Sequence, residues 1–391
     1  MNLAEARARD AADPLRHLRD RFLLPDGVIY LDGNSLGPLP RATVAANRDL
    51  IDRQWGERLI RSWSEGWMEA PQRIGSKIAP LIGADSDEVI VTDSTSVNLF
   101  KLIVAALQRD PARNVIVTEL GNFPTDLHIA EGAVSCILGA ELRAVPRDAL
   151  ADALDDRTAL VLLTHVHYKS GHRFDLPDWT SRAHDSGALI CWDLSHSTGA
   201  VALDLNAANA DCAVGCGYKY LNGGPGAPAY IYVARRHQAA LTNPISGWMG
   251  HAAPFAMEDG YRPGTGMERW RAGTPPMLAM NALEAGIDLF ADIDLALLEA
   301  KSAALFDAFA AAGDALGLEC VVPRDPSQRG SHIAFRHPHA RAITDALIER
   351  GVIGDFREPD IIRFGLTPLY LGYADIVRAA EILEEVLAAH R

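Results

Sequence analysis

Disulfide-forming cysteine, long apolar runs and excess positive charge are all scarce in this sequence, and each shortage excludes a class of protein. Five dispersed cysteines, an odd number, suit buried reduced thiols in the cytoplasm better than a disulfide framework. No uninterrupted apolar run approaches the roughly 20 residues of a membrane span, and the first 20 residues lack the apolar core of a signal peptide. The net charge of −14 argues against nucleic acid or an anionic membrane as partner. An anionic ligand must therefore be held by local donors.

Short β-branched runs alternate with helical patterns between residues 89 and 233. This alternation predicts an α/β fold with a mostly parallel, doubly wound sheet. The predicted strands are Val89–Thr92, Val115–Thr118, Ala159–Val166, Ala188–Asp193, Ala213–Gly217 and Ala229–Val233. Ligands of such sheets bind at the carboxyl ends of the strands.

The pattern changes beyond residue 275, which predicts a second, smaller lobe. Residues 277–311 are alanine-rich and predict one long helix joining the two lobes. Short strands at 320–322 and 332–335 and helices at 340–350 and 373–390 follow. We expect three segments: residues 1–55 contributing to the small lobe or to subunit contacts, 56–290 forming the large domain, and 291–391 the small C-terminal domain.

Lys219 stands between an apolar, strand-like run and the glycine-rich loop Gly223–Gly226. A lysine held at a strand end is a candidate for an imine link to a carbonyl compound, although a solvated surface lysine is the commoner case. Asp193, which lies 26 residues upstream, ends another apolar run. A strand-end lysine and a strand-end aspartate together suit pyridoxal phosphate, because the lysine forms the imine and the carboxylate pairs with the pyridinium nitrogen.

Three hydroxyl residues, Ser94, Thr95 and Ser96, follow a predicted strand and open a predicted helix. Hydroxyls and free backbone N–H groups at a helix N-terminus suit a phosphate, with simple N-capping as the alternative. Phe123, in the segment Phe123-Pro124-Thr125-Asp126, can stack on a flat heterocycle or else cap the core.

Other polar residues are candidates at the same strand ends. His196 lies three residues after Asp193 and can orient that carboxylate or a ring hydroxyl, and Tyr218 can serve as acid, base or phosphate ligand. Arg363 is flanked by apolar residues and is a candidate for a bidentate grip on an amino-acid carboxylate, with a surface arginine as the alternative. His165 and His167 alternate along one strand without a third ligand, so no metal site is expected.

Four segments together resemble the kynureninase family of pyridoxal-phosphate enzymes. They are Tyr30–Gly37, Phe123–Asp126, Cys216–Gly226 and Gly247–His251. The resemblance implies the aspartate-aminotransferase-like fold (fold type I), in which a large domain with a mostly parallel seven-stranded sheet carries a smaller C-terminal α/β domain. It also implies pyridoxal 5'-phosphate as the cofactor.

The resemblance assigns roles to individual residues. Lys219 would carry the cofactor, Asp193 would pair with its ring nitrogen and Phe123 would stack on the ring. The remaining cofactor contacts implied are Thr95, Ser96, Asp126, Thr164, His196 and Tyr218. Trp248 and Thr274 match positions that reach across a dimer interface in this family, so a homodimer with shared active sites is expected.

The substrate side follows from the same resemblance. Arg363 matches the arginine that binds the substrate carboxylate, and Asn34 and Ser35 are expected near the substrate. Thr274, with a tryptophan in the 63–67 region, resembles the bacterial pattern that favours kynurenine over its 3-hydroxy derivative. The choice between Trp63 and Trp67 stays open, and Trp63 is preferred.

The implied reaction is hydrolysis of L-kynurenine, or of 3-hydroxykynurenine, to anthranilate or 3-hydroxyanthranilate and L-alanine, with Lys219, Tyr218 and Asp193 as catalytic residues. A cysteine desulfurase-like lyase is the alternative, but it needs a cysteine on a mobile loop, whereas Cys320 lies in a strand-like run. A cofactor-binding regulator of transcription is a third hypothesis, disfavoured because only about fifty residues precede the cofactor lobe. The kinetic preference, and the role in tryptophan breakdown or in NAD biosynthesis, stay open.

Overall fold

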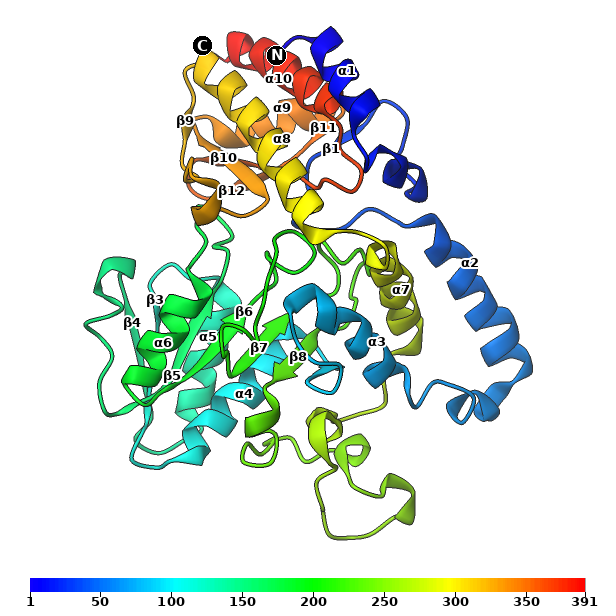
Figure 1. Cartoon of the computed structure of the whole chain (residues 1–391), viewed down its shortest axis with the longest axis vertical. Coiled ribbons are helices and arrows are strands. Elements are labelled where there is room, and N and C mark those ends of the chain that lie inside the picture. Colours follow the sequence, from blue (N-terminus) through cyan, green and yellow to red (C-terminus); the bar gives the residue numbers. More distant parts are fainter. Residues whose placement is uncertain (391) are drawn as a thin grey trace.

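A seven-stranded sheet forms the centre of the larger lobe (Figure 1). The computed structural model describes residues 1–390; residue 391, the last of the expected third segment, lies outside the described residues. The strands are β2 (Val89–Val91), β3 (Val115–Glu119), β4 (Glu141–Val145), β5 (Thr158–Thr164), β6 (Leu189–Asp193), β7 (Cys212–Gly215) and β8 (Tyr230–Val233), in the spatial order β2-β8-β7-β6-β5-β3-β4. Only β8 runs antiparallel to its neighbours within the described sheet, which confirms the expected mostly parallel α/β fold.

Helices cover both faces of this sheet because its strands are apolar on both faces. Along β5, Val161 and Leu163 face one buried cluster, whereas Leu160 and Leu162 face the other. The first cluster includes residues of α3 (Ala70–Ile78), α6 (Leu176–Asp185) and α7 (Met277–Ile287). The second includes residues of α4 (Thr95–Arg109) and α5 (Pro124–Ser135).

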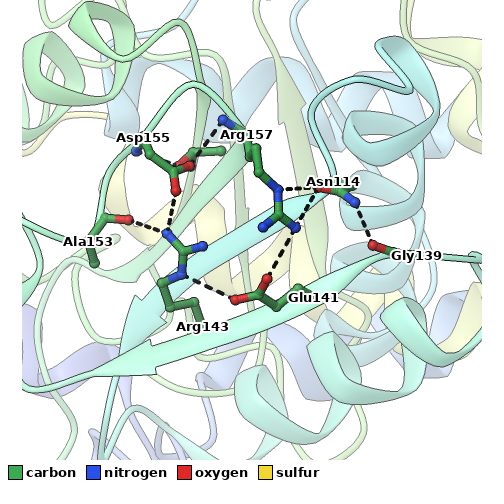
Figure 2. A network of polar contacts seen from close by, with 8 residues as sticks. Asn114, Gly139, Glu141, Arg143, Ala153, Asp155 and Arg157 are labelled. Atoms are coloured by element: carbon green, nitrogen blue, oxygen red, sulfur yellow. Dashed lines mark hydrogen bonds and ion pairs between the residues drawn. The ribbon is translucent and has the colours of Figure 1, made fainter.

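The six strands predicted between residues 89 and 233 are all present, and β4 is the one strand of the central sheet that the pattern did not predict. β4 is an edge strand whose residues are only partly buried. Its charged side chains join a polar network with the neighbouring loops (Figure 2). Arg143 donates to Asp155 at 2.9 Å, and Arg157 donates to Glu141 at 3.2 Å. Charges on an edge strand discourage pairing with another chain, and they also dilute the apolar signal in the sequence.

The smaller lobe is built on a four-stranded antiparallel sheet in the order β12-β13-β10-β9. Its strands are β9 (Glu319–Cys320), β10 (His332–Arg336), β12 (Asp355–Arg357) and β13 (Ile361–Gly365). Its helices are α8 (Leu295–Ala315), α9 (Ala340–Glu349) and α10 (Tyr373–Ala389). No helix within residues 1–390 has the length and apolar character needed to cross a membrane.

The amino-terminal segment belongs spatially to the smaller lobe. β1 (Ile29–Tyr30) pairs in parallel with β11 (Val352–Ile353), and α1 (Leu3–Ala12) packs beside α10. From there the chain runs through α2 (Arg41–Asp49), which extends as an arm along the side of the molecule (Figure 1), into the larger lobe.

The expectation of one long helix over residues 277–311 is wrong, because α7 and α8 are separate helices. Residues 288–294 separate them, and Asp294 caps the start of α8 by accepting a hydrogen bond from the Ala296 N–H at 2.9 Å. An aspartate favours the N-cap over the helix interior because its side chain competes for backbone N–H groups. The junction between the lobes is therefore a capped break rather than a continuous rod.

Candidate active site

A cavity of ≈ 110 Å³ lies at the carboxyl ends of the central parallel strands. It is lined by Ser94, Thr95, Ser96, Phe123, Thr125, Thr164, Tyr168, Asp193, Ser195, His196, Tyr218 and Lys219. Residues that are up to 125 positions apart meet there because parallel strands end at the same edge of the sheet. Nine of the residues that sequence reasoning singled out are thus brought together.

Lys219 differs from every other lysine of the chain. The amines of Lys77, Lys101, Lys169 and Lys301 all have oxygen partners. Within the described residues, no hydrogen bond or ion pair is formed by Lys219 Nζ, although the residue is only 8% exposed. This amine lies 5.5 Å from the ring centroid of Phe123 and 5.8 Å from that of Tyr218. A buried amine without a competing partner is available for a covalent bond.

Two buried carboxyl groups face Lys219. Asp193, the last residue of β6, accepts a hydrogen bond from the Ser195 N–H at 2.7 Å; burial raises its pKa, and Lys219 and the Ser195 amide oppose that rise. Asp126, in the first turn of α5, accepts a hydrogen bond from the Thr164 hydroxyl at 2.9 Å. Burial and the neighbouring Asp193 carboxylate raise the pKa of Asp126 well above its ordinary value. The amine of Lys219 is the cation that opposes the rise in pKa of both acids.

The start of α4 forms one end of the cavity. Ser94 is the N-cap, and its side chain accepts a hydrogen bond from the Val97 N–H at 3.3 Å. Thr95 and Ser96 are the first helical residues, whose N–H groups have no partner within the helix. Beneath them the fully buried Lys101 pairs with Asp93 and donates to the Trp270 carbonyl at 2.7 Å. The capping and phosphate interpretations are therefore compatible, since the cap leaves two backbone donors free.

His196 and Tyr218 are both uncharged in this environment. Burial, with the nearby Lys219 charge, lowers the pKa of His196 well below its ordinary value, and its Nδ1 has no hydrogen-bond partner. Burial also raises the pKa of Tyr218, with smaller contributions from Cys216 and Asp193. The phenol therefore carries its proton at neutral pH and can donate it.

Arg363 lies on β13, in the small lobe, and is almost completely buried at 1% exposure. Its Nε donates to Asp355 Oδ1 at 2.8 Å, and a second, very short contact joins the same two side chains. Nη1 donates to the Tyr168 carbonyl at 2.5 Å, and Nη2 donates to the Ser35 hydroxyl at 2.8 Å. A surface location is thereby excluded for this guanidinium.

An acidic pair surrounds this arginine. Burial would raise the pKa of Asp355, but Arg363 and Arg357 hold it below its ordinary value. Burial and the neighbouring Asp355 carboxylate raise the pKa of Asp32 to about 7. Asn34 lies two residues after Asp32 and is fully buried. Neither its amide oxygen nor its amide nitrogen has a hydrogen-bond partner.

Seven predicted site residues are not among the lining residues: Asn34, Ser35, Asp126 and Arg363 are described above, and three others lie outside the cavity altogether. Trp248 is 46% exposed and packs edge-to-face on Phe255, and Thr274 is also exposed. Trp63 is half-buried and contacts Trp67 edge-to-face at 5.3 Å, away from the lining residues. None of the three reaches the cavity within the single described chain.

Sequence reasoning missed Tyr168 and Asp355. Tyr168 contacts the Phe123 ring edge-to-face at 5.2 Å, and its carbonyl holds Arg363. Its position just after β5 is the signal that could have found it, since strand-end residues line such sites. Asp355 lies directly opposite Arg363 in the β12–β13 pair, a cross-strand match of charges that a hairpin prediction would have provided.

The lining residues and Asp126, which accepts a hydrogen bond from the lining residue Thr164, fit pyridoxal phosphate. Asp126 Oδ1 and His196 Nδ1 are buried without partners, which is the condition of groups that await a polar ligand. A free lysine amine, an ionisable acid opposite it and a helix N-terminus provide one attachment point, one partner for a ring nitrogen and one anion site.

Comparison with known proteins shows similarity to kynureninases along nearly the whole chain. A family profile described as the kynureninase C-terminal domain matches residues 298–383. A kynureninase of Burkholderia mallei is 52% identical over 98% of this chain and 95% of its own length. A kynureninase of Deinococcus radiodurans is 48% identical over 99% of this chain and 97% of its own.

Solved structures that resemble this one share the fold at low sequence identity. A cysteine desulfurase of Thermococcus onnurineus superposes with a TM-score of 0.82 at 20% identity, covering 95% of this chain and 98% of its own. A C-DES variant with glycine covalently linked to its pyridoxal phosphate superposes with a TM-score of 0.82 at 16% identity, covering 93% of this chain and 98% of its own.

Proposed function

This chain belongs to the kynureninase family, and on that premise we propose how its own residues hydrolyse L-kynurenine to anthranilate and L-alanine. The enzyme is a pyridoxal-phosphate-dependent hydrolase that acts on a carbon–carbon bond of a ketonic substrate. The observation that carries the assignment of the site is the unpartnered amine of Lys219, which faces Asp193 and Phe123 in the buried cavity.

We assign the cofactor contacts as follows. Lys219 holds the cofactor covalently, Asp193 holds the proton on its ring nitrogen, and Phe123 packs on the ring face. The α4 N-terminus at Thr95 and Ser96 receives the phosphate, and Asp126, Thr164, His196 and Tyr218 complete the contacts. When bound, pyridoxal phosphate supplies an electron sink for the pair of electrons released at the substrate's carbon atoms.

The protein's part in the reaction is proton transfer and positioning. With the cofactor bound, Lys219 would be the base that removes the proton from Cα. Tyr218 carries its proton at neutral pH, as an ordinary phenol does and as burial further favours by raising its pKa, and it transfers that proton at the breaking Cβ–Cγ bond. Water supplies the hydroxyl that becomes part of the anthranilate carboxyl group, and protons complete the methyl group of alanine.

The overall reaction has a direct test. Purified protein loaded with pyridoxal phosphate should release anthranilate, followed by its fluorescence, and equimolar L-alanine from L-kynurenine. Cofactor absorbance without anthranilate would agree with the fold and the cofactor but would contradict the proposed reaction. A desulfurase-like reaction is the alternative, but none of the described residues that line the cavity is a cysteine, and those enzymes are distant fold neighbours.

Arg363 is assigned to the substrate carboxylate, with Asn34 and Ser35 beside it. Arg363→Lys keeps the charge and loses the planar fork. We expect KM for L-kynurenine to rise about tenfold, the value of one charge-assisted hydrogen bond, with a smaller fall in kcat. Steady-state kinetics measure both. Arg336→Lys, an exposed arginine of the same sheet, is the matched control and should change neither.

A homodimer with shared active sites is also part of the proposal. Trp248 and Thr274 lie exposed outside the cavity, as residues that serve a partner's site must in a single chain. The arm that begins at α2 exposes a row of large apolar side chains: Val44, Ile51, Trp55, Leu59 and Ile60. Such an exposed apolar row is typical of an interface between subunits. A two-fold axis would place each arm on the other subunit.

Ile60→Asp should convert the dimer to monomers and lower activity in parallel. Ile60 is 77% exposed in the single chain, so the charge does not disturb the fold of the subunit, whereas in an interface it would be buried without a partner. Sedimentation velocity reports the mass, and anthranilate release reports activity. Glu57→Gln, an exposed polar position on the same arm, should keep both. A variant that remains dimeric and active would contradict the assigned interface.

Finer assignments complete the proposal. We place the lobe boundaries near residues 55 and 290 and the enzyme in the cytoplasm. We also propose that Trp63, supplied with Thr274 at the subunit interface, packs on the aniline ring and favours kynurenine over 3-hydroxykynurenine. Comparing kcat/KM for the two substrates in wild type and Trp63→Phe tests this last assignment.

A further inference from the structure

His332 is a fully buried histidine with no assigned task in the reaction. It begins β10 in the small lobe, is 0% exposed, and neither of its ring nitrogens has a hydrogen-bond partner in the protein. Burial, with the nearby Arg363 charge, lowers its pKa to about 3, so the ring is neutral. A neutral imidazole offers one donor and one acceptor, and leaving both unused in a dry site is costly.

The ring of His332 faces His196 across the boundary between the lobes. The two ring centroids lie 5.7 Å apart with an interplanar angle of 67°, an edge-to-face contact. His196 Nδ1 is buried without a partner as well. Three ring nitrogens, one from the large lobe and two from the small lobe, are therefore unpaired at a single contact.

His332 also shares a sheet face with Arg363. In the β10–β13 pair, His332 lies opposite Gly365, and Ala334 lies opposite Arg363. Residues two apart on a strand, and residues directly opposite each other, point to the same face, so both side chains project from one face of the small-lobe sheet. A Cβ on Gly365 would overlap the amide of Asn34, so this unpartnered amide lies on the same face.

The start of β10 is tied to both lobes. The Tyr220 hydroxyl, one residue beyond Lys219, donates to the Ser331 carbonyl at 3.1 Å. The Leu366 N–H donates to the same carbonyl at 2.9 Å. The segment that carries His332 is therefore bonded both to the chain leaving β13, the strand of Arg363, and to the large-lobe loop that follows Lys219.

We propose that His332 is a positioning residue that transmits occupancy of the carboxylate site at Arg363 to the cofactor-side His196, by an imidazole–imidazole hydrogen bond that forms when the small lobe seats against the large one. The inference rests on the proposed roles of Arg363 and His196. His332 touches neither the cofactor nor the reacting atoms in this scheme. It fixes the ring orientation and the tautomer of His196, which in turn contacts the cofactor.

The test uses the holoenzyme and propionate, a compound with the carboxylate of the substrate and no amine. Propionate should change the visible absorbance of the bound cofactor in wild type and in His332→Gln, because glutamine keeps a donor and an acceptor. In His332→Phe, which keeps a flat ring but no nitrogen, this response should be lost. The kcat of His332→Phe should fall about tenfold, the upper value for one hydrogen bond, with KM within about twofold. His339→Phe, an exposed histidine of the same lobe, should respond as wild type.

Contrary outcomes are separable. A wild-type enzyme that releases anthranilate but whose spectrum ignores propionate would overturn the coupling, and so would a normal response in His332→Phe. Equal losses in the glutamine and phenylalanine variants would mean a packing role only. If His332→Phe does not fold, His332→Asn, whose shorter amide falls short of His196, takes its place with the same expected loss. A wild type that releases no anthranilate would instead refute the proposed function.

Discussion

Lys219→Ala should lower the rate of anthranilate release by about 10⁴-fold, the upper range for a group that transfers a proton in the reaction. It should also remove the covalent adduct that borohydride traps between the protein and pyridoxal phosphate. Both losses have one cause, since the same amine holds the cofactor and removes the Cα proton. Fluorescence of released anthranilate and the mass of the intact reduced protein measure the two effects.

This experiment can identify the attachment site because the amines of the other four lysines all contact oxygen atoms. Peptide mapping of the reduced wild-type enzyme should find the cofactor on Lys219 alone. Lys77→Ala removes a half-buried lysine that pairs with Glu284 and Asp288, and it should retain both the adduct and the activity. An adduct that survives in Lys219→Ala would contradict the assignment of the attachment site.

Asp193→Asn should reduce kcat by about 10²–10³-fold, as expected for loss of one preorganised electrostatic partner in a buried site. The amide can still accept the Ser195 N–H, so the local fold is preserved, but it carries no charge to hold a proton on the cofactor's ring nitrogen. The electron sink is weakened while the covalent link through Lys219 is retained. Stopped-flow absorbance of the bound cofactor and steady-state kcat report the two properties separately.

Asp185→Asn provides the matched control for that experiment. Asp185 is an exposed acid at the end of α6, and its replacement should leave kcat unchanged. If Asp193→Asn kept full activity, the other buried acid, Asp126, would be the better candidate for the ring nitrogen, because it lies beside the same amine.

The parallel sheet and its strand-end residues could be predicted from the sequence because both follow from local patterns. Runs such as Ala188–Asp193 are apolar on both faces, and the rule that ligands bind at strand ends then groups Asp193 with Lys219. The edge strand β4 was not predicted because its charged residues mask the apolar pattern of a strand. The break between α7 and α8 was not predicted because the alanine-rich sequence on both sides is typical of one continuous helix, and only a single aspartate marks the new N-cap.

The carboxylate side of the site depends on contacts that no local pattern contains. Ser35 meets Arg363 across 328 positions of sequence, and His332 meets His196 across the two lobes. These pairings depend on how the small lobe packs on the large one, and the unpaired atoms of Asn34 and His332 become visible only when burial is known. The neighbours of positions proposed to contact a second subunit, such as Trp248 and Thr274, are harder still to predict, because they depend on how two chains pack together.

The pairing of β1 with β11 has a consequence for biosynthesis. Ile29 cannot pair with its partner strand until Val352 has been synthesised. The ribosome makes the intervening residues in roughly 20–60 s at about 5–20 residues per second. The large lobe can collapse during that interval, whereas the amino-terminal segment stays without its partner strand while the nascent chain lengthens. The apolar arm that begins at α2 is exposed over the same period. A chaperone that holds this stretch during translation would therefore raise the yield of native enzyme more than one added after the chain is released.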